Sequence, residues 1–250
     1  MAFGRVVVTV ASALSLVATA GRGVVMVDAQ TAERPRLTVG LVDDFEVTGS
    51  GGHVAWRKAE WTPMTSRQPA SHPYETRFKM LYSGTGLYVL MDGSDRSLTA
   101  TMDEDFMDLW NEDVFEVFLW TDERHPVYFE YEISPLNREL AILVPNFGGE
   151  FLGWRPWHYE AERLTRKGVS ILGGPAKSHA SIEGWRAEFF IPYALLKPLR
   201  NVPPKPGTRW RANCYRMDYD GGKRTAWAWA PVGNSFHEYE KFGELIFSGR

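Results

Sequence analysis

Hydrophobic and polar positions alternate with a period of two along most of the chain after residue 37. Successive residues of an extended strand point to opposite faces, so this pattern is typical of β-strands. The pattern is clear at residues 127–134, where one face is apolar and the other carries Tyr128, Glu130 and Glu132. We predict strands at residues 77–82, 87–91, 113–121, 127–134, 139–144, 169–172, 185–191, 208–219 and 242–247.

Turn-forming residues separate these strands. Gly84 and Gly86 lie between the first two and predict a hairpin, and one helical turn is expected at Tyr193–Leu196, directly after Pro192. Many short strands with a single helical turn predict an all-β fold, an antiparallel β-sandwich or jelly roll. No repeat or linker interrupts the pattern, so we expect one domain over residues 37–250.

The N-terminus has the order of a secretory signal peptide. Arg5 precedes an apolar run over residues 6–20, and small residues lead up to both Ala20 and Ala29. We therefore expect residues 1–29 to be removed and the protein to be secreted or periplasmic. A retained anchor is the alternative. No later stretch is apolar for long enough to cross a bilayer, so no membrane span is expected after signal removal.

Charge and cysteine content narrow the possible partners. The formal net charge is −3 and no basic run is present, so nucleic acid is not an expected partner. Cys214 is the single cysteine and lies in an alternating strand, which indicates a small buried hydrophobe and excludes an internal disulfide. Aromatic residues make up 14 % of the chain, with ten tryptophans, which favours a ligand that presents a flat apolar face.

The sequence Trp110-Asn111-Glu112-Asp113 is the strongest candidate for ligand contact. A pyranose has an apolar C–H face, which an indole can cover, and a rim of hydroxyls, which carboxylate and amide oxygens can accept from. Trp110 precedes a strand in a polar loop, where an exposed aromatic ring is plausible. The alternative is a tryptophan that covers the edge of the core.

Glu116 lies within an otherwise apolar strand, where an unpaired carboxylate is costly. We expect it to face a cleft or to pair with an arginine such as Arg216. Trp227 and Trp229 flank Ala228, and we expect their indoles to point in opposite directions, one into the core and one toward ligand. A second aromatic and polar cluster, a wall of the site or a lid, comprises Asn146, Trp154, Arg155, Trp157 and His158.

Two rival chemistries arise from the acidic residues. A glycoside hydrolase would need a pair of carboxyl groups, and the candidates are Glu112, Asp113, Glu116, Glu130 and Glu132. These carboxylates look distributed rather than paired, so no catalysis is expected. The acidic loop that carries Asp103, Asp105 and Asp108 could hold a structural calcium ion, although a solvated loop is the alternative.

Several phrases in a fixed order resemble the carbohydrate-binding module family 9-like domain, a member of the wider group of DOMON-type sandwiches. They include WRKAEW at residues 56–61, FKMLY at 78–82, GLYV at 86–89, LWNEDVFEVFL at 109–119, YFEYEISP at 128–135, GWRAE at 184–188, WRAN at 210–213, WAP at 229–231 and FH at 236–237. The resemblance extends from about residue 37 to the C-terminus.

This resemblance implies a β-sandwich that binds poly- or oligosaccharide in a cleft between two tryptophans and takes part in glycan breakdown without catalysis. It implies that Trp110 and, six residues later, Glu116 line the cleft, with Trp227 or Trp229 opposite. Asn111, Glu112, Asp113, Glu130 and Arg216 are the expected polar rim. The chain departs from the family on one strand, where Glu130 and Glu132 stand in place of an arginine.

Related DOMON-type sandwiches can hold haem, which is the rival from another class of function. The candidate ligands are Met80, Met91, Met102, Met107 and His237. Methionine at alternating strand positions is normally core, and no cysteine motif for haem attachment is present. We therefore expect no cofactor, and a structural calcium ion in the acidic loop is the alternative.

Overall fold

The computed structural model describes residues 33–68, 74–148, 150–157 and 160–249 of the chain. The predicted signal peptide lies outside these residues. Residues 34–250 form one unit. Its strands are β1 (Arg36–Leu41), β2 (Thr62–Pro63), β3 (Thr65–Ser66), β4 (Thr76–Tyr82), β5 (Gly86–Ser94), β6 (Val114–Trp120), β7 (Val127–Ile133), β8 (Glu139–Phe147), β9 (Glu150–Phe151), β10 (Arg155–Pro156), β11 (Arg166–Leu172), β12 (Gly184–Pro192), β13 (Arg209–Asp218), β14 (Thr225–Ala228) and β15 (Gly243–Phe247).

Helical structure in the described residues is limited to single turns. The α-helical turn is α1 (Tyr193–Leu196), and the 3-10 turns are η1 (Val54–Lys58), η2 (Leu109–Asn111), η3 (Ala161–Arg163), η4 (Asp220–Gly222) and η5 (Tyr239–Lys241). None of the helices among the described residues has the length and apolar character that crossing a membrane requires.

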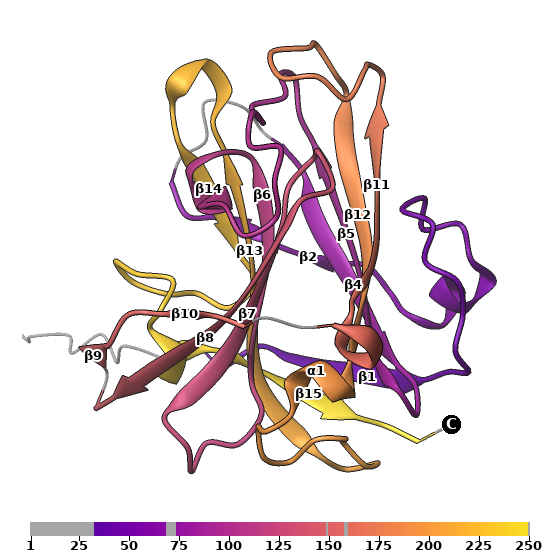
Figure 1. The fold of residues 1–250 in the computed structure, drawn as a ribbon, viewed down its shortest axis with the longest axis vertical. Helices are drawn as coiled ribbons and strands as arrows, with labels where there is room; N and C mark the ends of the chain where they lie inside the picture. Colours follow the sequence, from indigo (N-terminus) through magenta and orange to yellow (C-terminus); the bar gives the residue numbers. More distant parts are fainter. Residues whose placement is uncertain (1–32, 69–73, 149, 158–159, 250) are drawn as a thin grey trace, which may run out of the picture. The chain divides into compact units, whose positions relative to one another are not determined.

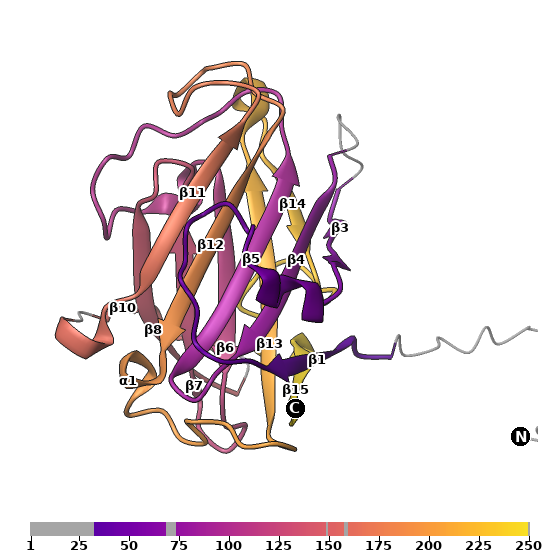
Figure 2. The ribbon, with the colours of Figure 1, turned by 90° about the vertical axis from the view of Figure 1, so that its right-hand side faces the viewer.

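The strands form two layers that face each other (Figure 1). The first sheet has the order β10-β8-β7-β6-β13-β15, with β14 also paired to β13, β3 to β14 and β9 to β8. The second sheet has the order β4-β5-β12-β11, with β2 paired to β4. Strand β1 joins the two layers, because Arg36–Val39 pair with β15 and Gly40–Leu41 pair with β4 (Figure 2).

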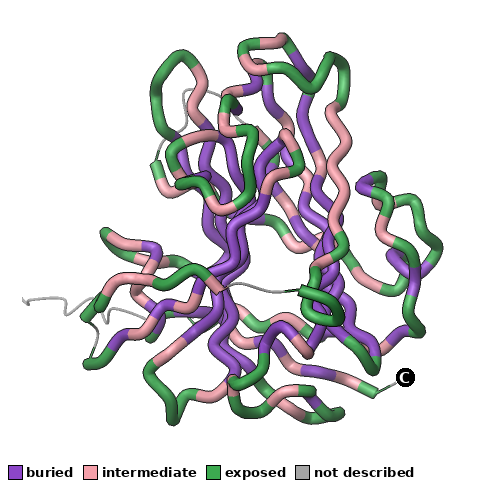
Figure 3. Tube along the Cα trace, viewed as in Figure 1, coloured by how far each residue is buried: buried purple, intermediate pink, exposed green. Residues whose placement is uncertain are grey.

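The main core lies between the inner faces of the two sheets, and Figure 3 shows buried residues along both layers. Alternation along each strand determines which residues enter it. Phe129, Tyr131 and Ile133 of β7 point inward as predicted, and Cys214 of β13 is buried there too. Burying this many large apolar side chains is the dominant stabilising contribution to such a fold.

The outer face of the first sheet is also largely buried. Phe118, Tyr128, Ile142, Tyr215 and Met217 form a second apolar cluster there. The segment 232–242 and the turn η2 supply further members, which include Leu109, Phe236, Tyr239 and Phe242. Strands β6 and β7 are therefore covered on both faces, and the cavity described below opens within this outer layer.

The predicted fold is confirmed as an all-β sandwich, and each predicted strand and the helical turn are present. The expectation of purely antiparallel pairing needs one correction, because β1 runs parallel to both β15 and β4. Short strands such as β14 were not predicted, since two to four residues carry too little periodicity to be recognised.

Candidate functional site

A cavity of about 330 Å³ lies on the outer face of the first sheet. Side chains from β6, β7, β8 and β13 form its floor, and loops on either side form its walls. Its lining residues are Arg67, Trp110, Glu116, Phe118, Glu130, Ile142, Phe151, Trp154, Met217, Arg224, Asn234, Ser235, Phe236 and His237. The volume lies at the small end of the range for ligand pockets.

The floor of the cavity is acidic. Glu116 of β6 pairs directly with Glu132 of β7 across the two strands, and Glu130 lies two residues along β7 on the same face. All three side chains are almost fully buried. Glu116 and Glu130 line the cavity, whereas Glu132 does not. Both carboxylate oxygens of Glu132 and the Oε2 atom of Glu130 have no hydrogen-bond partner among the described residues, and His237 Nδ1 lies 3.9 Å from that Glu130 oxygen.

This arrangement shifts the proton affinity of the three carboxyl groups. Burial raises the pKa of Glu130 to about 8. Burial, reinforced by the neighbouring carboxylates, also raises the pKa of Glu116 and of Glu132. Like charges in a dry site cannot all ionise together, so the cluster retains protons near neutral pH. It can therefore both donate and accept hydrogen bonds.

Aromatic side chains form the walls. Trp110 and Trp154 meet edge to face with their ring centroids 5.6 Å apart. Phe151 stacks on His237 with the centroids 4.2 Å apart. His237 Nδ1 lies 2.5 Å from the Tyr128 hydroxyl, and burial lowers the pKa of His237 to about 4, so this ring is neutral at neutral pH.

Of residues 110–113, only Trp110 lines the cavity. Asn111 is exposed outside its lining. Glu112 accepts the backbone N–H groups of Thr101 and Met102 at 2.6 and 3.1 Å. Asn111 and Glu112 therefore do not form the polar rim that was expected.

Asp113 is fully buried, and its role is structural rather than ligand contact. It accepts the backbone N–H groups of Thr99 and Tyr219 at 2.6 and 2.9 Å. Burial raises the pKa of Asp113 to about 8. This carboxyl group ties two loops together at the end of β6 and does not line the cavity.

The expectation that Trp227 and Trp229 point in opposite directions is wrong. Both indoles lie in the core between the sheets, with 2 % and 8 % of their surface exposed. Residues i and i+2 of a strand share a face, so the two tryptophans must point the same way. The intervening Ala228 faces the outer layer instead.

Arg216 is likewise on the inner side of β13 and is not a rim residue. Its guanidinium lies 3.1 Å from Asp95 and 2.6 Å from Asp218. Its strand neighbour Tyr215 is the residue that lies opposite Glu116. The two faces of β13 therefore separate Arg216 from Glu116, and the pairing considered from sequence does not form.

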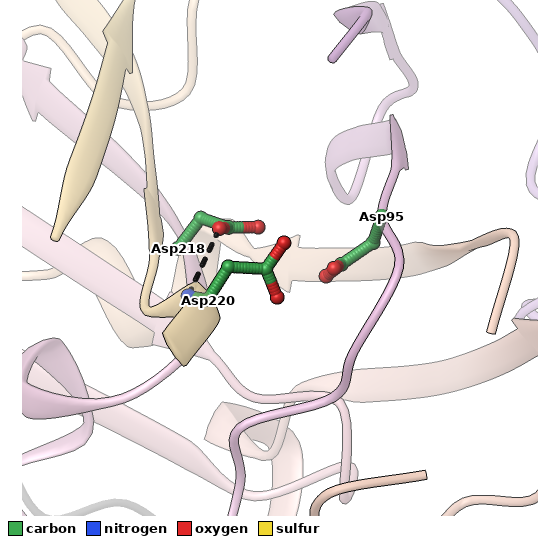
Figure 4. Close-up of side chains that lie close together, drawn as sticks. All are labelled: Asp95, Asp218 and Asp220. Carbon is green, nitrogen blue, oxygen red and sulfur yellow. Dashed lines mark hydrogen bonds between the residues drawn. The ribbon is translucent and has the colours of Figure 1, made fainter. Parts of the chain in front are cut away.

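Among the described residues, Asp95, Asp218 and Asp220 are the carboxylates gathered closely enough to share a cation (Figure 4). Arg216 already ion-pairs with two of them, and the Tyr74 hydroxyl bonds to Asp220. Burial of Asp95 raises its pKa to about 7. The cluster is therefore built around an internal cation, the guanidinium of Arg216.

The acidic loop does not assemble the calcium ligands considered from sequence. Asp103, Asp105 and Asp108 are not gathered into a cluster within the described part of the chain. Asp105 instead contacts Lys167 at 3.0 Å and accepts the backbone N–H of Glu139 at 2.9 Å. Calcium binding by this loop stays a prediction that the geometry does not favour.

The residues proposed as haem ligands are dispersed. Met80 and Met91 are buried in the main core, whereas Met107 is exposed. Met102 packs against the outer apolar cluster. Only His237 lines the cavity, and its Nδ1 atom is engaged with Tyr128.

The second aromatic cluster contributes one wall residue. Trp154 lines the cavity, while Trp157 packs on the main core and donates its indole N–H to the Leu195 carbonyl at 2.8 Å. Asn146 is buried, Arg155 is exposed, and His158 lies outside the described residues.

Sequence reasoning missed Arg67, Phe151, Arg224 and the segment Asn234–Phe236 as lining residues. Apart from Phe236, none of them belongs to a recognisable local motif, because they come from loops and from the short strand β9, which meet only in the folded chain. The pair Phe236-His237 was the one available signal, since it is among the phrases that resemble the family.

The comparisons with known proteins agree with this fold. Residues 47–140 match the family model described as carbohydrate family 9 binding domain-like. This match bears out, over residues 47–140, the resemblance to the carbohydrate-binding module family 9-like domain that was found in the sequence. The comparison with curated proteins found no significant match.

Solved structures with the same fold share 17 % sequence identity with the chain. One is a protein from Bacteroides uniformis described as carbohydrate-binding, with a TM-score of 0.72, covering 86 % of this chain and 100 % of that one. Two further structures are of a family 9 carbohydrate-binding module from Caldicellulosiruptor kristjanssonii, one in complex with cellotriose and one in complex with glucose. Both have a TM-score of 0.62 and cover 86 % of this chain, with 95 % and 97 % of the other chain matched respectively.

Proposed function

We propose that the chain binds a poly- or oligosaccharide in the cavity described above and performs no chemistry on it. The observation that supports this most is the composition of the cavity. Two indoles stand at its wall above the buried carboxyl groups of Glu116 and Glu130, and the Oε2 atom of Glu130 lacks a hydrogen-bond partner among the described residues. Sugar rings need both kinds of contact.

The binding geometry follows from these groups. Trp110 would cover the apolar C–H face of one ring, Trp154, inclined at 71° to it, would contact the edge of that ring, and Glu116 and Glu130 would accept from its hydroxyls. A buried acceptor without a partner is costly, so a hydroxyl that satisfies it contributes more than an exposed contact would. Few atoms are buried in a cavity of this size, which predicts modest affinity, on the order of micromolar to millimolar.

The position of the carboxyl groups favours binding over hydrolysis. They were expected to be distributed, yet Glu116, Glu130 and Glu132 are gathered on one face of adjacent strands. A glycosidase needs two carboxyl groups that flank the scissile bond. Side chains rising from a single face all approach the ligand from the same side, so they hold hydroxyls rather than divide the roles of acid and nucleophile.

We further propose an exported protein that assists glycan breakdown. The signal-like order of residues 1–29 supports export, to the cell exterior or the periplasm. The solved relatives named above are described as binding carbohydrate, and two of them hold cellotriose or glucose. An exported protein can reach extracellular polymeric glycans, so export is consistent with saccharide binding.

Replacement of Trp110 by alanine tests the proposed site. A glycan array first identifies the saccharide that the chain prefers, and calorimetric titration then measures its affinity. Aromatic geometry contributes ~0.5–1.5 kcal/mol beyond area burial, and lost apolar contact adds to it. We therefore expect Trp110→Ala to weaken binding at least tenfold, or ~1.4 kcal/mol, with the saccharide recovered intact after titration.

Trp61→Ala is the matched control. Trp61 is a partly exposed tryptophan on the outer side of the second sheet, where Arg77 and Lys79 lie over its ring at 4.5 and 4.9 Å. It should bind the saccharide as the parent chain does. Equal affinity of Trp110→Ala and the parent chain, with both proteins folded, would remove the cavity as the binding site.

A further inference from the structure

A second cavity adjoins the first. It has a volume of about 440 Å³ and is lined by Thr65, Ser66, Arg67, Gln68, Arg224, Ala228, Pro231, Val232, Gly233 and Asn234. Arg67, Arg224 and Asn234 line both cavities, so the two are continuous at these three residues. We call the two cavities together the groove, with two arginines at their junction.

Strand pairing explains why the two arginines meet. Arg67 follows β3 directly, and its backbone N–H donates to the Ala226 carbonyl of β14 at 2.8 Å. Arg224 directly precedes β14 and contacts Met217, which belongs to the same outer cluster as Ala226. Ala226 packs in the outer cluster, so its face of β14 is the one that carries the cavity.

Both guanidinium groups are oriented by neutral partners. Arg67 donates to the Gly233 carbonyl, and its Cζ lies 4.8 Å from the centroid of the Phe236 ring. Arg224 Nε donates to the Met217 sulfur at 3.1 Å, and its Cζ lies 5.8 Å from the same ring. Both guanidinium groups therefore lie near the same aromatic ring, that of Phe236.

Neither arginine has a carboxylate partner within ion-pair distance in the part of the chain that the structure describes, although Arg186, Arg211 and Arg216 all do. The internal residues outside the described ranges include no aspartate or glutamate. Both guanidinium groups lie near the Phe236 ring, and solvent reaches Arg67 in part and Arg224 freely. Their charge is available to whatever occupies the groove.

We propose that Arg67 and Arg224 bind an anionic group of the saccharide, a carboxylate or a sulfate ester, on the sugar unit next to the one held by Trp110. This inference rests on the proposed function, because it assigns the class of saccharide to that same groove. A guanidinium presents a planar fork of N–H donors that matches the oxygens of either anion, and such charge-assisted hydrogen bonds are the strong ones.

The acidic floor orients the ligand. Glu116 and Glu130 line the first cavity and, because they retain protons, offer an anionic group no positive charge, whereas the arginines at the junction do. An anionic group is therefore directed toward the arginines. Hydroxyl groups of the neighbouring neutral ring face the floor. Arg224 lies close enough to Glu116 to lower its pKa against the raising effect of burial. The groove thus binds hydroxyl groups in the first cavity and a negatively charged group at the junction of the two cavities.

The test compares matched saccharides on the full exported chain. The panel contains trisaccharides of glucose, galactose and mannose, each in neutral, uronic acid, uronic methyl ester and sulfated forms. Calorimetric titration gives the ratio of the affinity for the acidic form to that for the neutral form. We expect a ratio of at least ten, falling as salt rises because the contact is electrostatic. The uronic and sulfated arms identify which anion is preferred, and the methyl ester should bind like the neutral form.

The double variant Arg67→Gln/Arg224→Gln should bring the ratio to about one. Arg57→Gln is the control, because Arg57 is an exposed arginine of η1 that lines neither cavity. It removes one positive charge and should leave the ratio unchanged. Thermal melts confirm that each variant is folded.

The inference is overturned if the parent chain binds acidic and neutral forms equally, or if the double variant keeps the preference. In either case a loss of binding in Trp110→Ala still supports the proposed function. Normal binding by Trp110→Ala, or no binding to any panel member, removes the proposed function and this inference together.

Discussion

Glu130 shows how a single residue sets the chemistry of the floor. It is one of two glutamates on the strand where the family resemblance led us to expect an arginine, and it faces the same side as Glu116 and Glu132. An arginine at this point would neutralise one carboxylate, whereas the glutamate adds a third. Because the site is buried, the three carboxyl groups keep protons near neutral pH instead of forming an ion pair.

The raised pKa of Glu130 predicts a stability that depends on pH. Burial holds this pKa at about 8, above its ordinary value of 4.5, so the folded state keeps a proton that the unfolded state releases. The contribution of Glu130 to the free energy of unfolding is fully present below about pH 4.5. It falls as the pH rises toward 8, by up to ~1.4 kcal/mol per pH unit for one proton. Glu130→Gln removes this titration, so thermal melts from pH 5 to pH 8 should show a flatter profile.

Asp122→Asn is the control for this measurement. Its hydrogen bonds with Arg124 lower the pKa of Asp122 to about 2, so its contribution is lost only as the pH falls below its ordinary value of 3.8. The profile between pH 5 and pH 8 should stay as in the parent chain. A Glu130→Gln profile as steep as the parent's would show that Glu130 is ionised in the folded state.

At the scale of the element, β13 and β14 separate two kinds of chemistry by alternation alone. Their inner faces supply Arg216, Trp227 and Trp229 to the interior, and their outer faces supply Tyr215 and Met217 to the layer around the cavity. A residue near the site in sequence can therefore be remote from the ligand. Face, rather than proximity in the chain, decides which residues bind.

Truncation of the two buried tryptophans tests this division. Trp227→Ala and Trp229→Ala each remove a large side chain from the core, so each should lower the free energy of unfolding by ~3–5 kcal/mol. At a temperature where the variants remain folded, each should bind the saccharide as the parent chain does. Denaturant unfolding and calorimetric titration measure the two effects. A variant that keeps its stability but loses its ligand would place that indole in the groove.

At the scale of the whole molecule, β1 links the two sheets into one structure. Its first residues pair with β15 and its last two with β4, and Val39 is fully buried between the layers. A strand that changes partners in this way couples the first sheet, which carries the groove, to the second. We therefore expect the sheet that carries the groove to be stabilised by a segment that does not line it.

Truncation from the N-terminus tests this coupling. A chain that starts at Arg34 keeps β1 and should melt at the same temperature as one that starts at Gln30. A chain that starts at Val42 lacks β1, and the burial of Val39 alone is worth ~1.5–3 kcal/mol. For a chain of this size we expect the melting temperature to fall by at least roughly 3 °C. No change would show that the sheets hold together without β1.

How far the sequence could predict this protein differs between the fold and the site. Strands such as β7 and β12 were predictable because period-two alternation is a local property of the chain. The same alternation placed Glu130 and Glu132 on one face. It also contained the correct answer for Trp227 and Trp229, because residues two apart in a strand point the same way.

The sequence by itself determined the sandwich class, the strands and the position of Trp110 before an acidic strand. Only the tertiary structure decided which faces meet. It turned Arg216 inward toward Asp95 and Asp218, and it brought Arg67 beside Arg224 through the pairing of β3 with β14. Alternation states that a side chain leaves one face of a strand, but the partner across that face comes from a distant segment, and no local pattern encodes it.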